Sequence, residues 1–282
     1  MKTILLTGSN GMLATDFVKY CGNDFKIHAF DKHNLDITNI EEIEKIISEI
    51  KPDIVLNCAA YTAVDDAEDI GKLKNYEINT IGVYNLAKIT NRYNMYFITI
   101  STDYVFDGEN KNGYSENANC NPINEYGMSK YLAEKLALSE NINTIIIRTS
   151  WLYGGGKQFK NFVNTMLKLS ETRNELKVVN DQFGIPTYTK DLSFAIKETI
   201  EKINNLKGTI LHFSNSSDKP ITWFDFASEV FKLSGKNISL IPCISSEFIT
   251  KAKRPNFSSL INNSDIKLRN WKEGISDYID NL

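Results

Sequence analysis

Short apolar runs alternate with longer helical patterns through the first half of this chain, and this alternation restricts the fold more than any other feature. It is typical of βαβ units, which build a parallel sheet covered by helices on both faces. Between residues 39 and 50 isoleucines recur at the spacing of one helix face, and Asn39 can cap the start of that helix. We expect strands at residues 3–6, 26–30, 53–57, 96–100 and 144–148, and helices at 39–50, 66–91 and 125–139.

The pattern changes after Trp151, where helices mix with isolated strands that polar connections separate. We therefore predict an α/β fold with a Rossmann-type doubly wound parallel sheet at residues 1–150. A smaller, mixed α/β C-terminal lobe is expected at residues 151–282, and some of its segments can return to the first part. The strands expected in this lobe are 176–179, 209–213 and 239–241.

Composition excludes several classes of function. The net charge of −3 argues against nucleic acid or an anionic membrane as a partner, because both require clustered positive charge. The four cysteines, Cys21, Cys58, Cys120 and Cys243, have neither zinc-site nor disulfide spacing. No apolar run reaches the roughly 18 residues of a membrane span, and the run near the N-terminus is too short for a signal peptide. We expect a cytoplasmic protein with reduced cysteines.

The first apolar run leads into TGSNGMLA at residues 7–14, a Gly-x-x-Gly-x-x-Ala turn that opens into a helical pattern. At Gly8 and Gly11 no Cβ prevents backbone N–H groups from approaching a pyrophosphate, and the next helix directs its N-terminus at the same charge. A strand before the turn and a helix after it are the context that dinucleotide binding requires. A glycine-rich turn that binds nothing is the alternative.

Asp31 ends the second expected strand and follows Gly8 at close to the spacing of about 20 residues at which an acidic side chain binds the ribose of NAD. A carboxylate at this position repels a 2′-phosphate, whereas the adjacent Lys32 can pair with one. We predict use of NADH with tolerance for NADPH. An ordinary polar residue at a strand end is the competing explanation.

Tyr126 and Lys130 lie four residues apart in a predicted helix and so share one of its faces. A free tyrosine has a pKa of about 10 and exchanges protons poorly at neutral pH. A neighbouring cation stabilises the phenolate and lowers that pKa, which suits acid-base catalysis. Tyr and Lys also occur at this spacing on ordinary amphipathic helices.

Several candidate segments fall where predicted strands end. They are the Gly8 turn, Asp31, the Ala59-Ala60 pair and Thr102. In an open parallel sheet, ligands bind beyond the carboxyl ends of the strands. These segments should therefore meet in one crevice, which favours an enzyme over a set of unrelated surface loops.

Seven stretches, in order along almost the whole chain, resemble a known family: TGSNGMLA, NCAAYTAVDDAE, STDYVFDG, YGMSK, RTSWLYG, DQFGIPT and KRPNFSSL. The chain resembles the extended short-chain dehydrogenases/reductases, and within them the dTDP-4-dehydrorhamnose reductase family. The resemblance implies an NAD(P)H-dependent oxidoreductase that reduces the C4 ketone of dTDP-4-dehydro-β-L-rhamnose to dTDP-L-rhamnose. The second part of the chain would then be a substrate-binding lobe.

The resemblance also implies roles for individual residues. Tyr126 would donate the proton, and Thr102 would hydrogen-bond the reacting oxygen. Lys130 would lower the pKa of Tyr126 and hold the nicotinamide ribose. The sugar would contact Thr102, Asp103 and Trp151. The expected cofactor-binding residues are Gly8, Asn10, Gly11, Met12, Leu13, Asp31, Asp36, Ile37, Ala60, Tyr61, Thr62, Ile100, Tyr126 and Lys130.

Trp151 and a basic loop are substrate candidates with competing structural explanations. An indole suits the apolar face and methyl group of a deoxysugar, although most tryptophans pack in a core. The loop with Lys251, Lys253 and Arg254 suits a nucleotide diphosphate, although both lysines equally fit a solvated surface. Trp151 and Arg254 are the stronger candidates.

Other functions remain open within the same superfamily. Related 4,6-dehydratases carry an Asp-Glu pair after the threonine, whereas Tyr104 follows Asp103 here, so dehydration is disfavoured. A 4-epimerase, or a 4-ketoreductase of a different sugar, would share Tyr126 and Lys130. A non-catalytic regulatory relative would keep the fold without needing the complete set of Thr102, Tyr126 and Lys130.

Some relatives in this family form a homodimer around Mg²⁺ held by carboxylates, and Asp16 and Asp191 occupy the corresponding positions. Those relatives have glutamate there, and the sequence assigns no third ligand. We carry forward Mg²⁺ at Asp16 and Asp191 as an expectation, with a monomer or a homodimer as the assembly and a nucleotide sugar as the partner.

Overall fold

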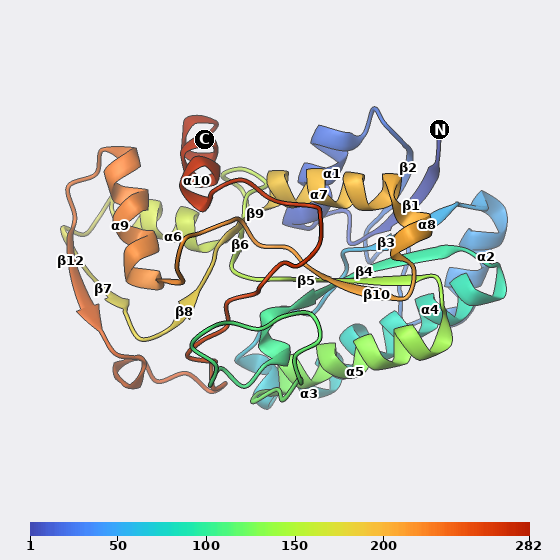
Figure 1. The fold of residues 1–282 in the computed structure, drawn as a ribbon, viewed down its shortest axis with the longest axis horizontal. Helices are drawn as coiled ribbons and strands as arrows, with labels where there is room; N and C mark the ends of the chain where they lie inside the picture. The colour runs from blue at the N-terminus through green and yellow to red at the C-terminus, as the bar shows by residue number, and fades with distance from the viewer.

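The computed structural model describes residues 1–282, and its largest element is a six-stranded sheet in the order β10-β5-β4-β3-β1-β2 (Figure 1). Every strand pair in this sheet is parallel. Order and direction together confirm the predicted Rossmann-type sheet. The strands are β1 (Thr3–Thr7), β2 (Lys26–Phe30), β3 (Ile54–Asn57), β4 (Tyr96–Thr102), β5 (Thr144–Thr149) and β10 (Thr209–His212).

Helices cover both faces of this sheet (Figure 1). On one face α1 (Met12–Cys21) packs along α7 (Thr189–Glu201), which the short α8 (Ile203–Leu206) follows. The other face carries α2 (Ile40–Ile50), α4 (Val83–Arg92) and α5 (Glu125–Glu140). No helix in the chain has both the length and the apolar character that a membrane crossing requires.

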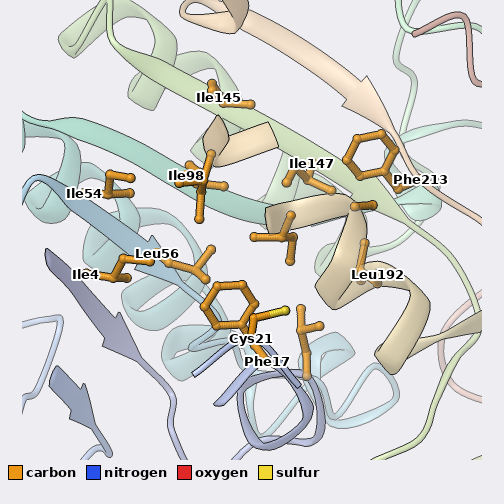
Figure 2. Packing of buried hydrophobic residues seen from close by; sticks show 14 of the residues in the cluster. Ile4, Phe17, Cys21, Ile54, Leu56, Ile98, Ile145, Ile147, Leu192 and Phe213 are labelled. Atoms are coloured by element: carbon orange, nitrogen blue, oxygen red, sulfur yellow. The ribbon is translucent and has the colours of Figure 1, made fainter. Parts of the chain in front are cut away.

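The apolar runs form this sheet because both of their faces are buried. Successive residues of β1 point to opposite sides: Ile4 packs toward α1 and α7, whereas Leu5 packs toward α2 and α4. Figure 2 shows the first side, where Phe17 of α1 and Leu192 of α7 meet the isoleucines of β3, β4 and β5. Asn39 caps α2 as expected, with its side chain accepting from two backbone N–H groups.

The remainder of the second half forms a smaller lobe of paired short strands and helices (Figure 1). Its core is rich in aromatic side chains, including Tyr153, Tyr188, Phe226 and Trp271. The strand pairs are β6 (Leu152–Tyr153) with β9 (Thr187–Tyr188), β7 (Glu175–Val179) with β12 (Ser239–Cys243), and β8 (Phe183–Gly184) with β11 (Ile221–Thr222). The helices are α6 (Phe162–Leu169), α9 (Trp223–Ser234) and α10 (Trp271–Asp280).

Two elements from beyond residue 150 complete the first part of the molecule, one as a strand of the large sheet and one as a helix on its face. Strand β10 pairs with β5 at its edge, and α7 covers the face that α1 begins to cover. The sheet is therefore completed by residues that follow the start of the lobe. The division at residue 150 stays a prediction.

The helix expected at residues 66–91 is not continuous, so that prediction was wrong in detail. A 3-10 turn at Asp66–Glu68 leads to α3 (Lys72–Tyr76), a π-helical turn at Glu77–Gly82, and then α4. The side chain of Asn79 in the π-turn hydrogen-bonds a neighbouring loop. π-turns of this kind are frequent at functional sites.

Candidate functional site

The glycine turn after β1 packs closely against the backbone of the loop that follows β3. Gly8 adopts a φ of +69°, and a Cβ there would lie 2.6 Å from the backbone nitrogen of Ala59. Gly11 is the N-cap of α1 and supplies no side chain to its first N–H groups. These donors and the positive end of the helix fit a pyrophosphate.

Asp31 lies beside this turn, immediately after β2. Its Oδ2 accepts from the side chain of Asn10 at 2.8 Å, and its Oδ1 accepts from the backbone N–H of His33 at 2.9 Å. The hydrogen bond from His33 is the largest of the effects that lower the pKa of Asp31. Asn10 and Asp31, both predicted cofactor residues, are thus held together by a direct bond.

The loop after β3 carries Ala60, Tyr61 and Thr62 and is fixed by a residue that the sequence analysis missed. Asn79 accepts from the backbone N–H of Tyr61 at 2.8 Å and donates to its carbonyl at 3.0 Å. An asparagine inside an otherwise helical pattern was the available signal, since its amide competes for backbone partners.

The side chains of the other predicted cofactor residues are at least partly buried or hydrogen-bonded within the protein. Leu13 and Ile37 are buried in the two cores that flank the sheet, so they could meet a ligand through their backbone. Asp36 accepts from the backbone and hydroxyl of Thr38. Met12 opens α1, and the carbonyl of Ile100 accepts a hydrogen bond from Lys130.

The three predicted catalytic residues come from β4 and α5. Thr102 ends β4, and its hydroxyl donates to Oδ1 of Asp103 at 3.0 Å. Tyr126 and Lys130 lie in the first turns of α5, which Asn124 caps by accepting from the N–H of Gly127. The Thr102 hydroxyl lies near enough to the Tyr126 phenol to lower its pKa. The structure thus brings Thr102 and Tyr126 together.

The pKa of Tyr126 does not follow the expected direction. Burial and the nearby charge of Asp103 raise this pKa to about 12, and the Thr102 hydroxyl opposes the rise. The Lys130 ammonium donates to the Ile100 carbonyl at 2.7 Å, and burial lowers its own pKa to about 8. The expected lowering of the Tyr126 pKa by Lys130 is therefore not seen: burial and Asp103 raise this pKa, and Lys130 is not among the groups that act on it.

Asp103 is a buried carboxyl group in the 3-10 turn after β4. Its side chain is 2% exposed, and its Oδ2 has no hydrogen-bond partner. Burial raises the pKa of Asp103 to about 6, although the Ser258 and Thr102 hydroxyls favour the charged form. A buried oxygen without a partner is costly, and this cost favours the protonated carboxyl group.

A cavity of about 820 Å³ opens in the smaller lobe next to these residues. Tyr104 connects the two sites, because it lines the cavity and its ring meets the ring of Tyr126 edge-on at 5.9 Å. Aromatic side chains of α6 and α9, Phe162 and Trp223, line the cavity together with Arg254. Aromatic and basic groups in one concave site fit a nucleotide.

Trp151 does not line this cavity. Its indole stacks on Trp223, with ring centroids 3.6 Å apart, and its backbone has a φ of +48°. A Cβ on Gly184 would lie 2.6 Å from the same indole. Trp223 is the tryptophan that faces the cavity, and sequence reasoning missed it because an aromatic residue at a helix start looks like any core residue.

With this geometry in place, the comparisons with known proteins identify the family. A family model described as RmlD substrate binding domain matches residues 1–282. The chain belongs to this family. The dTDP-4-dehydrorhamnose reductase of Aggregatibacter actinomycetemcomitans is 37% identical over 92% of this chain and 90% of the relative.

Solved structures of RmlD-family relatives have the same fold over their whole length. A dTDP-4-dehydrorhamnose reductase from Clostridium acetobutylicum is 40% identical, covers 99% of both chains and has a TM-score of 0.93. A dTDP-4-dehydrorhamnose reductase from Bacillus anthracis, solved in complex with NADP, is 37% identical over 100% of this chain and 99% of its own, with a TM-score of 0.94.

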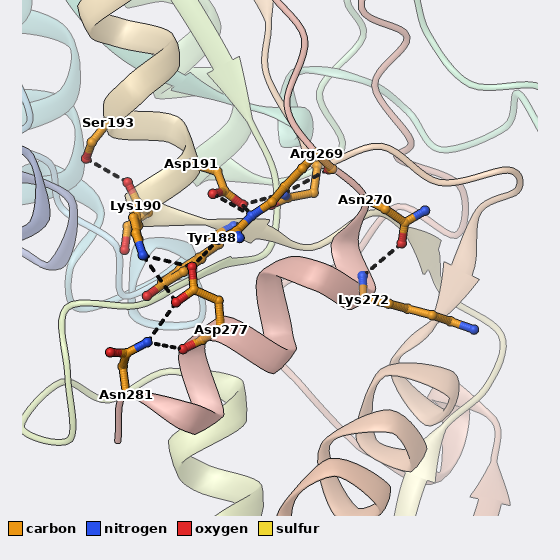
Figure 3. Close-up of polar contacts among 11 residues, drawn as sticks. Tyr188, Lys190, Asp191, Ser193, Arg269, Asn270, Lys272, Asp277 and Asn281 are labelled. Atoms are coloured by element: carbon orange, nitrogen blue, oxygen red, sulfur yellow. Dashed lines mark hydrogen bonds and ion pairs between the residues drawn. The ribbon is translucent and has the colours of Figure 1, made fainter. Parts of the chain in front are cut away.

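The carboxylates expected to hold Mg²⁺ in this RmlD-family chain do not fit a metal site. Asp16 accepts from the backbone N–H of Gly155 at 2.9 Å and from the Thr189 hydroxyl. Asp191 pairs with Arg269, as Figure 3 shows. No three His, Cys, Asp or Glu side chains are arranged to hold a metal ion. The residues present satisfy these carboxylates with protein donors.

Proposed function

We propose that this chain reduces the C4 ketone of dTDP-4-dehydro-β-L-rhamnose with hydride from NAD(P)H and forms dTDP-L-rhamnose. The observation that carries the proposal is the Thr102-Tyr126 pair beside a cavity that Tyr104 and Arg254 line. Near-full-length relatives with this activity in their names support the same substrate. The expected partner is therefore a nucleotide sugar.

The reduced nicotinamide, when bound, supplies the hydride that adds to C4. The residues of this chain then handle the proton. Tyr126, whose raised pKa keeps it protonated at neutral pH, donates to the alkoxide, which is a stronger base than a phenolate. Thr102 hydrogen-bonds the same oxygen, and Lys130 stabilises the phenolate charge from the next turn of α5.

The cofactor would lie along the carboxyl ends of the strands. The Gly8–Gly11 turn and the start of α1 would hold the pyrophosphate, Asp31 and Asn10 the adenosine ribose, and the loop after β3 the nicotinamide half. The Bacillus anthracis relative binds NADP, so we propose that this chain accepts both NADPH and NADH, with Asp31 favouring NADH.

Asp103 and Arg254 are proposed to bind the substrate. Asp103 would receive a sugar hydroxyl at its unpartnered Oδ2, and Arg254 would receive the diphosphate in the cavity of the smaller lobe. We propose Trp151 as a support for Trp223, which would contact the nucleoside or sugar directly. Because protein donors satisfy Asp16 and Asp191, the proposal includes no Mg²⁺.

The direct test is oxidation of NADPH or NADH with freshly generated dTDP-4-dehydrorhamnose, with the C4 configuration of the product determined by NMR. Tyr126→Phe should lower kcat by about 10² to 10⁴. Tyr131→Phe, on the same helix, is the matched control and should leave kcat unchanged. Equal kcat for wild type and Tyr126→Phe would refute the assignment of Tyr126.

The same assay separates the alternative functions. Transfer of hydride to a different sugar nucleotide, with none to this one, would indicate another 4-ketoreductase. Net epimerisation with cofactor that remains bound through purification would indicate a 4-epimerase. Nucleotide binding without any hydride transfer would indicate a regulatory relative.

A further inference from the structure

One wall of the cavity in the smaller lobe is made by a single segment, residues 248–256, which we call the pocket strap. Its members line the cavity almost continuously, from Phe248 through Arg254 and then Asn256. The strap is mostly exposed to solvent, and Ala252 and Pro255 are its only buried residues. Polar attachments must therefore hold it in place.

Asp65, in the loop between β3 and α3, makes the most extensive of these attachments. Its Oδ1 accepts from the backbone N–H of Ala252 at 3.1 Å and from Nη1 of Arg254 at 2.7 Å. Its Oδ2 accepts from Nη2 of Arg254 at 2.6 Å. The carboxylate thus accepts one hydrogen bond from the backbone of the strap and two from the Arg254 side chain. The two bonds from Arg254 have the bidentate geometry that arginine favours.

These contacts use one edge of the Arg254 guanidinium, and Asp65 does not contact the other edge. Nη1 donates to Asp65 and also to the carbonyl of Ala252 at 2.7 Å, so both of its N–H groups are used. Nη2 makes one of its two bonds. The edge formed by Nε and the remaining N–H of Nη2 is the second bidentate face of the group. The Tyr104 hydroxyl also interacts with this guanidinium, so an anion bound at the second edge would lie beside Tyr104.

The other polar attachments of the strap also come from the first half of the chain. Asn124, the cap of the catalytic helix α5, donates to the carbonyl of Lys253 at 2.8 Å. Lys251 pairs with Asp69 at the surface, where the two side chains are 55% and 44% exposed. The Arg254 side chain is 18% exposed and that of Asp65 is 42% exposed, so the Asp65 pair is better shielded at its cation while the two carboxylates are equally exposed.

We propose that Asp65 is a positioning residue for the substrate: it fixes the pocket strap and orients the second edge of Arg254 toward the phosphate groups of the nucleotide sugar. This inference rests on the proposed function, because that function supplies the diphosphate. Asp65 follows the expected cofactor loop Ala60–Thr62 by three residues, so the same short segment would serve both ligands.

The charge of Asp65 would repel a diphosphate, and orientation must outweigh that repulsion. The Arg254 side chain lowers the pKa of Asp65 to about 2, so the carboxylate stays charged at working pH. The contact with Arg254 weakens the field of Asp65 at the cavity and weakens that of Arg254 equally, so the proposed gain comes from fixing the position of the guanidinium donors. Whether removal of Asp65 weakens or strengthens the binding of dTDP is therefore the deciding observation.

The test measures binding of dTDP and of NADPH to full-length protein by isothermal titration calorimetry. Asp65→Ala removes every contact, and Asp65→Asn keeps the side-chain volume in case the alanine variant folds poorly. Asp69→Asn breaks the exposed pair on the same strap and is the matched control. Arg254→Ala and the double variant Asp65→Ala/Arg254→Ala complete a double-mutant cycle.

We expect Asp65→Ala and Asp65→Asn to weaken dTDP binding about tenfold, with NADPH binding and the control variant within twofold of wild type. The double variant should bind dTDP no more weakly than Arg254→Ala alone. Tighter or unchanged dTDP binding, an equal loss of NADPH affinity, or full additivity in the cycle would overturn the inference.

Failure of the proposed function gives a different result. Wild type that binds dTDP but does not reduce dTDP-4-dehydrorhamnose would refute the function, and the cycle would still decide the role of Asp65. Wild type that reduces the sugar while the Asp65 variants bind dTDP normally would refute the inference alone.

Discussion

Glu134 and Arg148 form a bidentate ion pair in which each side chain is 2% exposed. Nε and Nη2 of Arg148 donate to the two carboxylate oxygens at 2.9 and 2.7 Å. The Ser101 hydroxyl, one residue before Thr102, donates to the same carboxylate. The pair lies one helical turn beyond Lys130 and thus supports the strand and helix that carry the catalytic residues.

Breaking this pair should be strongly destabilising. Glu134→Ala leaves the Arg148 charge buried without its partner, and we expect a loss of about 3–5 kcal/mol in the free energy of unfolding by urea denaturation. Glu44→Ala, which breaks the exposed pair with Arg92, should cost at most about 1 kcal/mol. Equal losses for the two variants would contradict this account of the buried pair.

Asp103 should make stability depend on pH in a defined direction. Burial raises its pKa to about 6 from an ordinary value of ~3.9, so the folded state holds a proton that the unfolded state releases between these values. Asp103 therefore contributes stability at low pH and loses that contribution as the pH rises through 6.

Asp103→Asn removes the ionisable group at nearly constant volume. We expect a higher Tm than wild type at pH 7.5 and a smaller difference at pH 4.5, measured by differential scanning calorimetry. A gain of the same size at both pH values would assign the effect to packing instead of ionisation.

Asp31→Ala should change the choice of cofactor. Loss of the carboxylate removes the repulsion of a 2′-phosphate, so kcat/KM for NADPH divided by that for NADH should rise about tenfold or more. The ratio is the useful measurement, because loss of the Asn10 contact would weaken both cofactors alike. Asp24→Ala, at the opposite end of β2 in a partly exposed pair with Lys197, should leave the ratio at the wild-type value.

Because Arg269 pairs with both Asp191 and Asp277, the thermal stability of the protein should not depend on a divalent metal ion. The guanidinium of Arg269 joins Asp191 of α7 to Asp277 of α10, and Lys190 joins the same Asp277 (Figure 3). EDTA should leave the Tm of wild type unchanged. Arg269→Ala should cost about 1–3 kcal/mol, because Asp191 is buried and loses a charged donor.

One result would support the binding of Mg²⁺ by Asp16 and Asp191 after all. If EDTA lowered the Tm of wild type and Mg²⁺ brought it back, the carboxylates would be binding an ion despite their protein partners. Lys272→Ala, which removes a neighbouring exposed lysine of α10, is the control for the Arg269 variant and should keep the wild-type Tm.

The sequence predicts the parts of this molecule that local pattern determines. Alternation of apolar runs placed the strands of the main sheet within two residues of their ends, and the spacing of glycines located the turn at Gly8. Periodicity could not reveal the π-turn around Asn79, because that turn depends on a bond to a loop eighteen residues earlier in the chain.

Side-chain pairing between distant segments was also beyond the sequence. Arg254 was recognised as a cation, but its partner Asp65 lies 189 residues away and looked like one acid among several. Trp151 and Trp223 illustrate the same limit, since residue type alone does not say which indole faces a cavity and which supports it.

The position of β10 has a consequence for how the chain is made. Strand β5 consists of buried residues, Thr144–Thr149, and one of its edges is covered only by β10. A nascent or truncated chain that ends before residue 209 exposes an apolar, unpaired parallel edge, which is a ready template for aggregation. Fragments that stop at the apparent domain boundary should therefore be insoluble, and a soluble expression product needs to extend at least through β10.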